Sequence, residues 1–143
     1  MANRYVFPIF NSHDEIVGFD GRYIHPIPRD ENGKPKIKPW KILGESRHFV
    51  WGGLDEIEDC GRAILVESIG DSLKLGQCGV PESLCLFGTN LSSAVLGHLI
   101  AANPREIIVA TNRDLKHAVG QNASVKIART LQTFFNADMI KIA

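Results

Sequence analysis

Residues 61–143 alternate short runs of consecutive apolar residues with helical patterns, and this alternation restricts the fold more than any other feature. Strand-length runs occur at residues 62–67, 83–88 and 106–112, and a fourth begins at residue 138. The stretches between them, 71–78, 90–103 and 118–135, are typical of helices. Strands without polar alternation are buried on both faces, as in a parallel sheet covered by helices. We therefore predict an α/β fold with a mainly parallel four-stranded sheet and helices on both faces.

The last helical stretch has the clearest periodicity. Val119, Ala123, Ile127, Leu131 and Phe134 recur at spacings of four and three residues. Residues at this spacing lie on one face of a helix. We expect that face, including Phe134, to pack on the sheet.

The first part of the chain has a different pattern. Two extended runs, residues 4–10 and 15–27, flank a polar turn and predict a β-hairpin. Residues 28–41 are rich in proline, glycine and charge, which is typical of an exposed loop or a weak third strand. We predict a small, basic, β-rich subdomain over residues 1–60 and the α/β domain over residues 61–143.

Charge and cysteine content exclude some classes of protein. The chain has 16 basic and 16 acidic residues, so its net charge does not by itself indicate a nucleic-acid partner. Its three cysteines, Cys60, Cys78 and Cys85, form no Cys-x-x-Cys pair, which argues against a disulfide scaffold and against zinc. We expect Cys78 and Cys85 to be buried. With no long apolar stretch, we expect a cytoplasmic protein with no membrane partner.

Polar side chains follow two of the predicted strands. Glu67 ends the first strand, Asp71 comes four residues later, and Asn112 and Asp114 follow the third strand. Ligands bind outside the carboxyl ends of parallel strands, so these side chains converge if the two strands are neighbours. Carboxylate and amide oxygens are the ligands that Mg²⁺ prefers.

Each of these residues also has a structural interpretation, which the sequence leaves open. A single glutamate at a strand end is usually a solvated surface acid. Asp71 could only favour a helix N-terminus through the helix dipole. Asn112 could only shape a turn by bonding its own backbone.

Several segments, in the same order, resemble the TOPRIM domain and the core of bacterial and phage DNA primases. "ILVESIGDSLKL" (64–75) is similar to the glutamate motif of TOPRIM domains, and "IIVATNRD" (107–114) to its Asp-x-Asp strand end. "LFGTNLSS" and "AVGQNASVKIA" resemble the primase segments around that strand end. "YVFPIFNSHDEIVGFDGRYI" and "PWKILGESRHFVWGGL" resemble the segments before the TOPRIM domain. The resemblance covers almost the whole chain.

Three residues depart from the family pattern. Ser68 replaces a glycine, Asn112 replaces the first acid of Asp-x-Asp, and Asp20 replaces a glycine of "GFGGR". The family also continues into a further acidic segment and a helical bundle. The resemblance therefore implies a primase catalytic core, or a piece of one.

The resemblance implies an enzyme that makes short RNA primers on single-stranded DNA by template-directed nucleotidyl transfer. The implied catalytic residues are Glu67, Asp71, Asn112 and Asp114, with Mg²⁺, or Mn²⁺ as an alternative, bound by Glu67, Asp71 and Asp114. The implied partners are ribonucleoside triphosphates, a DNA template and a replicative helicase. The implied location is the bacterial cytosol or the cytosol of a phage-infected host.

Basic residues gather in the first part of the chain, beside Tyr23 and Trp40. A single-strand groove needs cations for phosphates and aromatic rings for bases, although such a cluster is usually a solvated face. By resemblance, Arg22 and Lys41 match positions that primases use around template and nucleotide. The residues that we predict to bind nucleic acid are Arg22, Lys36, Lys38, Lys41 and Arg47.

Two other classes of function stay open. A small TOPRIM nuclease or strand-nicking enzyme shares the acidic site, although "GFDGRYI" argues against it. A non-catalytic module that binds single-stranded nucleic acid is the other alternative, since Asn112 could have abolished the chemistry.

Overall fold

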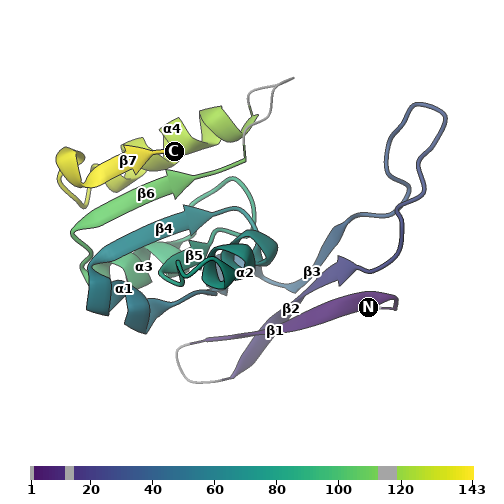
Figure 1. Cartoon of the computed structure of the whole chain (residues 1–143), viewed down its shortest axis with the longest axis horizontal. Coiled ribbons are helices and arrows are strands. Elements are labelled where there is room, and N and C mark those ends of the chain that lie inside the picture. The colour runs from purple at the N-terminus through teal and green to yellow at the C-terminus, as the bar shows by residue number, and fades with distance from the viewer. Residues whose placement is uncertain (1, 12–14, 113–118) are drawn as a thin grey trace. The chain divides into compact units, whose positions relative to one another are not determined.

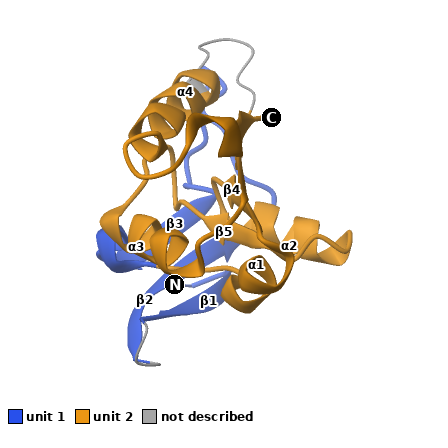
Figure 2. Ribbon diagram, turned by 90° about the vertical axis from the view of Figure 1, so that its left-hand side faces the viewer, with its two compact units in different colours: residues 1–49 blue, residues 50–143 orange. Residues whose placement is uncertain are grey.

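The computed structural model describes residues 2–11, 15–112 and 119–143. The chain divides into two compact units, Met1–Phe49 and Val50–Ala143 (Figure 2). This division precedes helix α1 (Leu54–Cys60), which the prediction of a boundary at residue 60 had assigned to the first part. The helix belongs to the second unit because its buried residue Ile57 packs into the core of that unit.

The second unit is built on a four-stranded parallel sheet. Its strands are β4 (Arg62–Val66), β5 (Ser83–Cys85), β6 (Glu106–Ala110) and β7 (Ile140–Ile142). Their order in the sheet is β5-β4-β6-β7, and every adjacent pair is parallel (Figure 1). The predicted parallel sheet is confirmed.

Helices lie on both faces of this sheet, as predicted. The connecting helices are α2 (Ile69–Gln77), α3 (Ser93–Ala102) and α4 (Val119–Leu131). The chain moves one way along the sheet from β4 to β5 and the other way in the next two crossovers. Because such crossovers are right-handed, α2 lies on one face and α3 and α4 lie on the other (Figure 2).

The core of the second unit lies between the sheet and helices α3 and α4, which cover one face of it. Its fully buried side chains include Leu65, Leu84, Val109 and Leu99. On α4, Ala123, Ile127 and Leu131 are also buried, as the helical periodicity predicted.

Two expectations about buried residues were wrong. Helix α4 ends at Leu131, and Phe134 is 54% exposed, while Phe135 packs against the core in its place. After Leu131 the backbone N–H groups of Thr133 and Phe134 donate to the carbonyls three residues back, those of Thr130 and Leu131, so a turn replaces the helix. Cys85 is buried as expected, but Cys78, at the exposed C-cap of α2, is not.

The first unit is a three-stranded antiparallel sheet. Its strands are β1 (Arg4–Phe10), β2 (Ile16–Tyr23) and β3 (Trp40–Gly44), in the order β1-β2-β3. The β-rich part therefore exists, but its third strand begins only at Trp40, and most of the predicted segment 28–41 is the connection between β2 and β3. Short 3-10 helices occur at Ser46–His48 in this unit and at Ala137–Met139 in the other.

Two paired glycines make room for the buried ring of Phe49 at one end of this sheet. Gly18 lies opposite Gly44 in the β2–β3 pairing. A Cβ atom on Gly18 would lie 2.2 Å from Cζ of Phe49, and one on Gly44 would lie 2.9 Å from the same atom. Phe49 is fully buried there, so the ring fixes the β2–β3 edge.

Within the described ranges, none of the helices has the length and apolarity that crossing a bilayer requires.

Asp20, which departs from the family pattern, is a buried carboxyl in β2. It is 3% exposed, and its Oδ1 accepts a hydrogen bond of 2.8 Å from the backbone N–H of Gly21. Burial raises the pKa of Asp20 above its ordinary value near 3.8, and the Gly21 hydrogen bond and the charge of Arg4 only partly oppose this.

We predict that Asp20→Asn stabilises the chain in a pH-dependent way. Between the ordinary pKa and the raised one, the unfolded carboxyl is ionised while the folded carboxyl keeps its proton, so wild-type stability falls as pH rises. The stability gained by Asp20→Asn should therefore grow through this window and then level off. Urea unfolding at several pH values measures it, and a constant difference would contradict the prediction.

Candidate functional site

The pairing of β4 with β6 brings two of the predicted site residues to one edge of the sheet. Val66 at the end of β4 lies opposite Ala110 at the end of β6. Glu67 directly follows Val66, and Asn112 comes two residues after Ala110. Both residues therefore lie at the carboxyl edge, where parallel sheets place their ligands.

The Glu67 carboxylate is held by two hydrogen bonds from Asn112. Its Oε1 accepts from the backbone N–H of Asn112 at 2.8 Å, and its Oε2 accepts from Nδ2 of the same residue at 3.0 Å. The Glu67 carbonyl also accepts from the Gly88 N–H at 3.0 Å. These contacts fix both the backbone and the carboxylate of Glu67.

The start of α4 holds Asn112 in turn. Thr111 donates its hydroxyl to the Gly120 carbonyl at 2.7 Å and shares a short hydrogen bond with the Ser124 hydroxyl. Gly120 packs so closely that a Cβ atom there would lie 1.7 Å from the Asn112 carbonyl oxygen. Only glycine fits at this position, because any side chain would overlap the Asn112 carbonyl.

Asp71 caps helix α2. Its Oδ2 accepts from the Ser68 hydroxyl at 2.7 Å and from the Ser68 N–H at 3.1 Å, while its own N–H donates to the Ser68 hydroxyl at 3.3 Å. This reciprocal arrangement is a capping box. Asp71 thus has a structural role at the N-terminus of α2, which it performs through hydrogen bonds with Ser68. Its role as a metal ligand stays a prediction.

The structure thus brings Glu67 and Asn112 together and places Asp71 in the helix that begins just after Glu67. Asp114 lies outside the described residues. Within the described ranges, no group of three His, Cys, Asp or Glu side chains could hold a metal ion. The donors that are described fit Mg²⁺ in kind, since they are hard oxygens, and carboxylate oxygens keep lone pairs beyond those already bonded.

Arg22 lies in a row of aromatic and cationic side chains on one face of the first unit's sheet. Tyr5 is opposite Arg22 in β1, and Trp40 is opposite it in β3. The Arg22 guanidinium lies 5.4 Å from the centre of the Trp40 ring, and that ring is 6.1 Å from the ring of Phe7. Tyr5 is 69% exposed.

The other predicted nucleic-acid contacts are not on that face. Lys41 pairs with Gly21, and neighbouring residues of a strand point to opposite faces, so Lys41 and Arg22 point apart. Lys36 and Lys38 lie in the connection between β2 and β3. Arg47 is exposed and forms an ion pair with Glu45.

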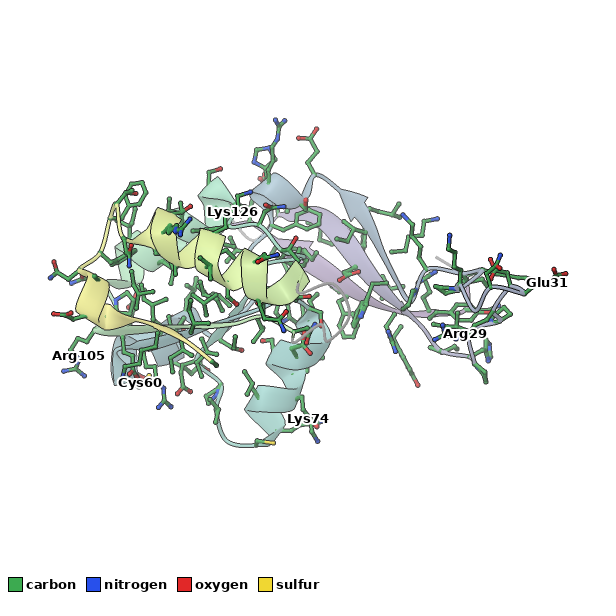
Figure 3. All side chains as sticks on the ribbon, turned by 90° about the horizontal axis from the view of Figure 1, so that it is seen from above. Arg29, Glu31, Cys60, Lys74, Arg105 and Lys126 are labelled. Carbon is green, nitrogen blue, oxygen red and sulfur yellow. The ribbon has the colours of Figure 1, made fainter. Side chains whose placement is uncertain are left out.

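A groove that none of the predicted residues lines lies on the solvent face of α4. Its volume is about 630 Å³, and its lining residues are Asn122, Val125, Lys126, Arg129, Thr130 and Thr133. Figure 3 shows Lys126 on this helix, where its Nζ donates to Oδ1 of Asn90 at 3.1 Å.

The sequence is similar to DNA primases. No family model matches the chain. The DNA primase of Rickettsia bellii is 29% identical over 142 residues, which are 96% of this chain and 22% of that protein. The DNA primase of Rickettsia prowazekii is 30% identical over 129 residues, 87% of this chain and 20% of that protein. The chain therefore spans about a fifth of the length of these relatives.

The fold is similar to that of solved primase domains. A DNA primase domain from Pseudomonas aeruginosa matches with a TM-score of 0.75 at 16% identity, over 99% of this chain and 43% of that one. A primase catalytic domain bound to single-stranded DNA matches with a TM-score of 0.69 at 19% identity, over 98% of this chain and 43% of that one. The chain thus shares its fold with part of the DNA primase catalytic core, as the sequence motifs predicted.

Sequence reasoning missed two parts of this site. Ser68 appeared only as a departure, although Ser-x-x-Asp before an apolar run is a recognisable capping signal. The donor role of Asn112 toward Glu67 had no signal, because 45 residues separate the two partners.

We predict that Gly120→Ala displaces Asn112 from Glu67. The added methyl group would overlap the Asn112 carbonyl, and relieving such an overlap costs about 1–3 kcal/mol. Gly76→Ala is the control, because that helical glycine has open space around it and should gain stability. Urea unfolding compares the variants, and equal effects would contradict the close packing.

Proposed function

We propose that this chain is the catalytic core of a DNA primase, which synthesises short RNA primers on single-stranded DNA. The strongest support is the combination of two findings. The chain is similar to DNA primases over nearly its whole length, and Glu67 lies at the carboxyl edge of the sheet. The reaction is the transfer of a nucleotide from a ribonucleoside triphosphate to a 3′-hydroxyl, with release of pyrophosphate.

We propose Glu67, Asp71 and Asp114 as ligands of Mg²⁺ or Mn²⁺. Asp114 enters from the sequence motif alone. The Asp71 capping contacts use Oδ2, and no hydrogen bond from the described residues reaches its Oδ1. A bound divalent ion would lower the pKa of the attacking hydroxyl and neutralise charge on the reacting phosphate.

The residues of the chain would act by position rather than by covalent attack. Glu67 is fixed at its backbone by Gly88 and at its carboxylate by Asn112, so it is held in place before any substrate arrives. Preorganised charge of this kind supplies most of the catalysis in phosphoryl transfer. No covalent intermediate is needed.

We predict that Glu67→Gln abolishes primer synthesis while the fold persists. The substitution keeps the volume and removes the charge, and synthesis should fall by at least about 100-fold, as for other losses of a preorganised charge. The assay supplies single-stranded DNA, ribonucleoside triphosphates and Mg²⁺ or Mn²⁺, and circular dichroism checks the fold. Glu58→Gln on the exposed side of α1 is the control.

The same assay separates the alternative functions. New oligoribonucleotides support a primase, cut DNA would indicate a nuclease or nicking enzyme, and a retarded but unchanged strand would indicate a binding module. Wild-type activity in Glu67→Gln would contradict the proposed site.

We propose that the template contacts the face of the first unit's sheet that carries Tyr5, Arg22 and Trp40. A single strand is bound by cations at its phosphates and by aromatic rings at its bases, and this row offers both. The expectation that this surface and the acidic edge share one cleft stays a prediction. Contacts from Lys36, Lys38, Lys41 and Arg47, and binding of a helicase, also stay predictions.

We predict that Arg22→Ala weakens binding of single-stranded DNA and lowers the salt dependence of binding by about 0.7, the value for one phosphate contact. Lys41→Ala removes one cation from the opposite face, and its effect on both quantities should be smaller. Fluorescence anisotropy at several salt concentrations measures them. Equal losses in the two variants would contradict the choice of face.

A further inference from the structure

We propose that Asn112 is a positioning residue that replaces a second divalent cation at the acidic edge, so that the edge binds a single metal ion. This inference rests on the proposed function, because it concerns how that site holds its metal. It goes further by giving a structural reason why Asn112, and not an acid, stands beside the predicted acidic residues of the site.

The first support is the use of both Glu67 oxygens. Asn112 donates to each of them, from its backbone at 2.8 Å and from its side chain at 3.0 Å. Since an ionised carboxylate only accepts hydrogen bonds, the side-chain amide must turn its N–H₂ group toward Glu67. The Asn112 side of the carboxylate is thus occupied by two donors of partial positive charge.

The second support is the packing behind Asn112. Gly120 of α4 packs against the Asn112 carbonyl, where an added Cβ atom would lie 1.7 Å from the carbonyl oxygen, and the same Cβ atom would lie 3.4 Å from Oε1 of Glu67. The backbone therefore holds the donors of Asn112 against Glu67 without help from an ion.

The third support is the charge that the amide avoids. A carboxylate at position 112 would bring two negative groups within hydrogen-bond distance, and like charges this close stay ionised together only when a cation lies between them. An amide pairs with Glu67 directly and needs no cation there. The remaining site for a metal is the side of Glu67 that faces away from Asn112.

The test counts bound Mn²⁺ in the whole chain by electron paramagnetic resonance and measures the melting temperature in EDTA and in Mn²⁺. Wild type should bind about one Mn²⁺, and Asn112→Asp about two, the number in sites where a pair of ions acts. In EDTA, Asn112→Asp should melt about 3 °C or more below wild type, and Mn²⁺ should restore the loss. Asn136→Asp adds the same charge at another exposed position and should change neither quantity.

The outcomes separate this inference from the proposed function. If Glu67→Gln binds Mn²⁺ like wild type, or wild type binds none, the proposed metal site is wrong and the inference falls with it. If Glu67→Gln loses the ion while Asn112→Asp binds no more Mn²⁺ than wild type, only the role of Asn112 is wrong. Two Mn²⁺ in wild type would also overturn it.

Discussion

The parallel pairing of β4 with β6 is the constraint on which the acidic edge depends. It sets Val66 opposite Ala110, so that the residues following the two strands meet at one edge. The buried faces of both strands, with Leu65 and Val109 fully inaccessible, prevent a slip of one residue, because a slip would turn those side chains to the other face. The position of Glu67 relative to Asn112 therefore follows from the packing of the core.

Hydrogen bonds from neighbouring residues hold both described acids at this edge. Asp71 and Ser68 satisfy the first N–H groups of α2, and Asn112 satisfies Glu67. Glu67 and Asp71, the two acids that the structure describes here, thus each have a structural partner in the chain itself. Such partners do not exclude a metal, since a carboxylate has more lone pairs than these bonds use. They mean that the acidic edge can fold without one.

The strands, the helices and the four-stranded sheet were predictable because they depend on local apolar patterns. The runs at β4, β5 and β6 and the periodicity of α4 carried enough information by themselves. The end of α4 was not predictable, since Phe134 has the right spacing but Thr133 forms a turn with Thr130. The bond from Asn112 to Glu67 was not predictable either, because it depends on the register between distant strands.

The same limit explains the basic residues of the first part. In the sequence, Arg22 and Lys41 belong to one cluster of cations, and Trp40 directly precedes Lys41. Alternation within a strand turns adjacent positions to opposite faces, and the β2–β3 pairing puts Arg22 opposite Trp40 and Gly21 opposite Lys41. A cluster of charge in sequence is therefore not one surface. Tyr23 and Phe19 share the face of Lys41, so both faces of this sheet carry aromatic rings. The face of Arg22 differs in that its cation lies over an aromatic ring of the neighbouring strand, Trp40, with the exposed Tyr5 on its other side, which is the combination of cation and rings that a single strand needs.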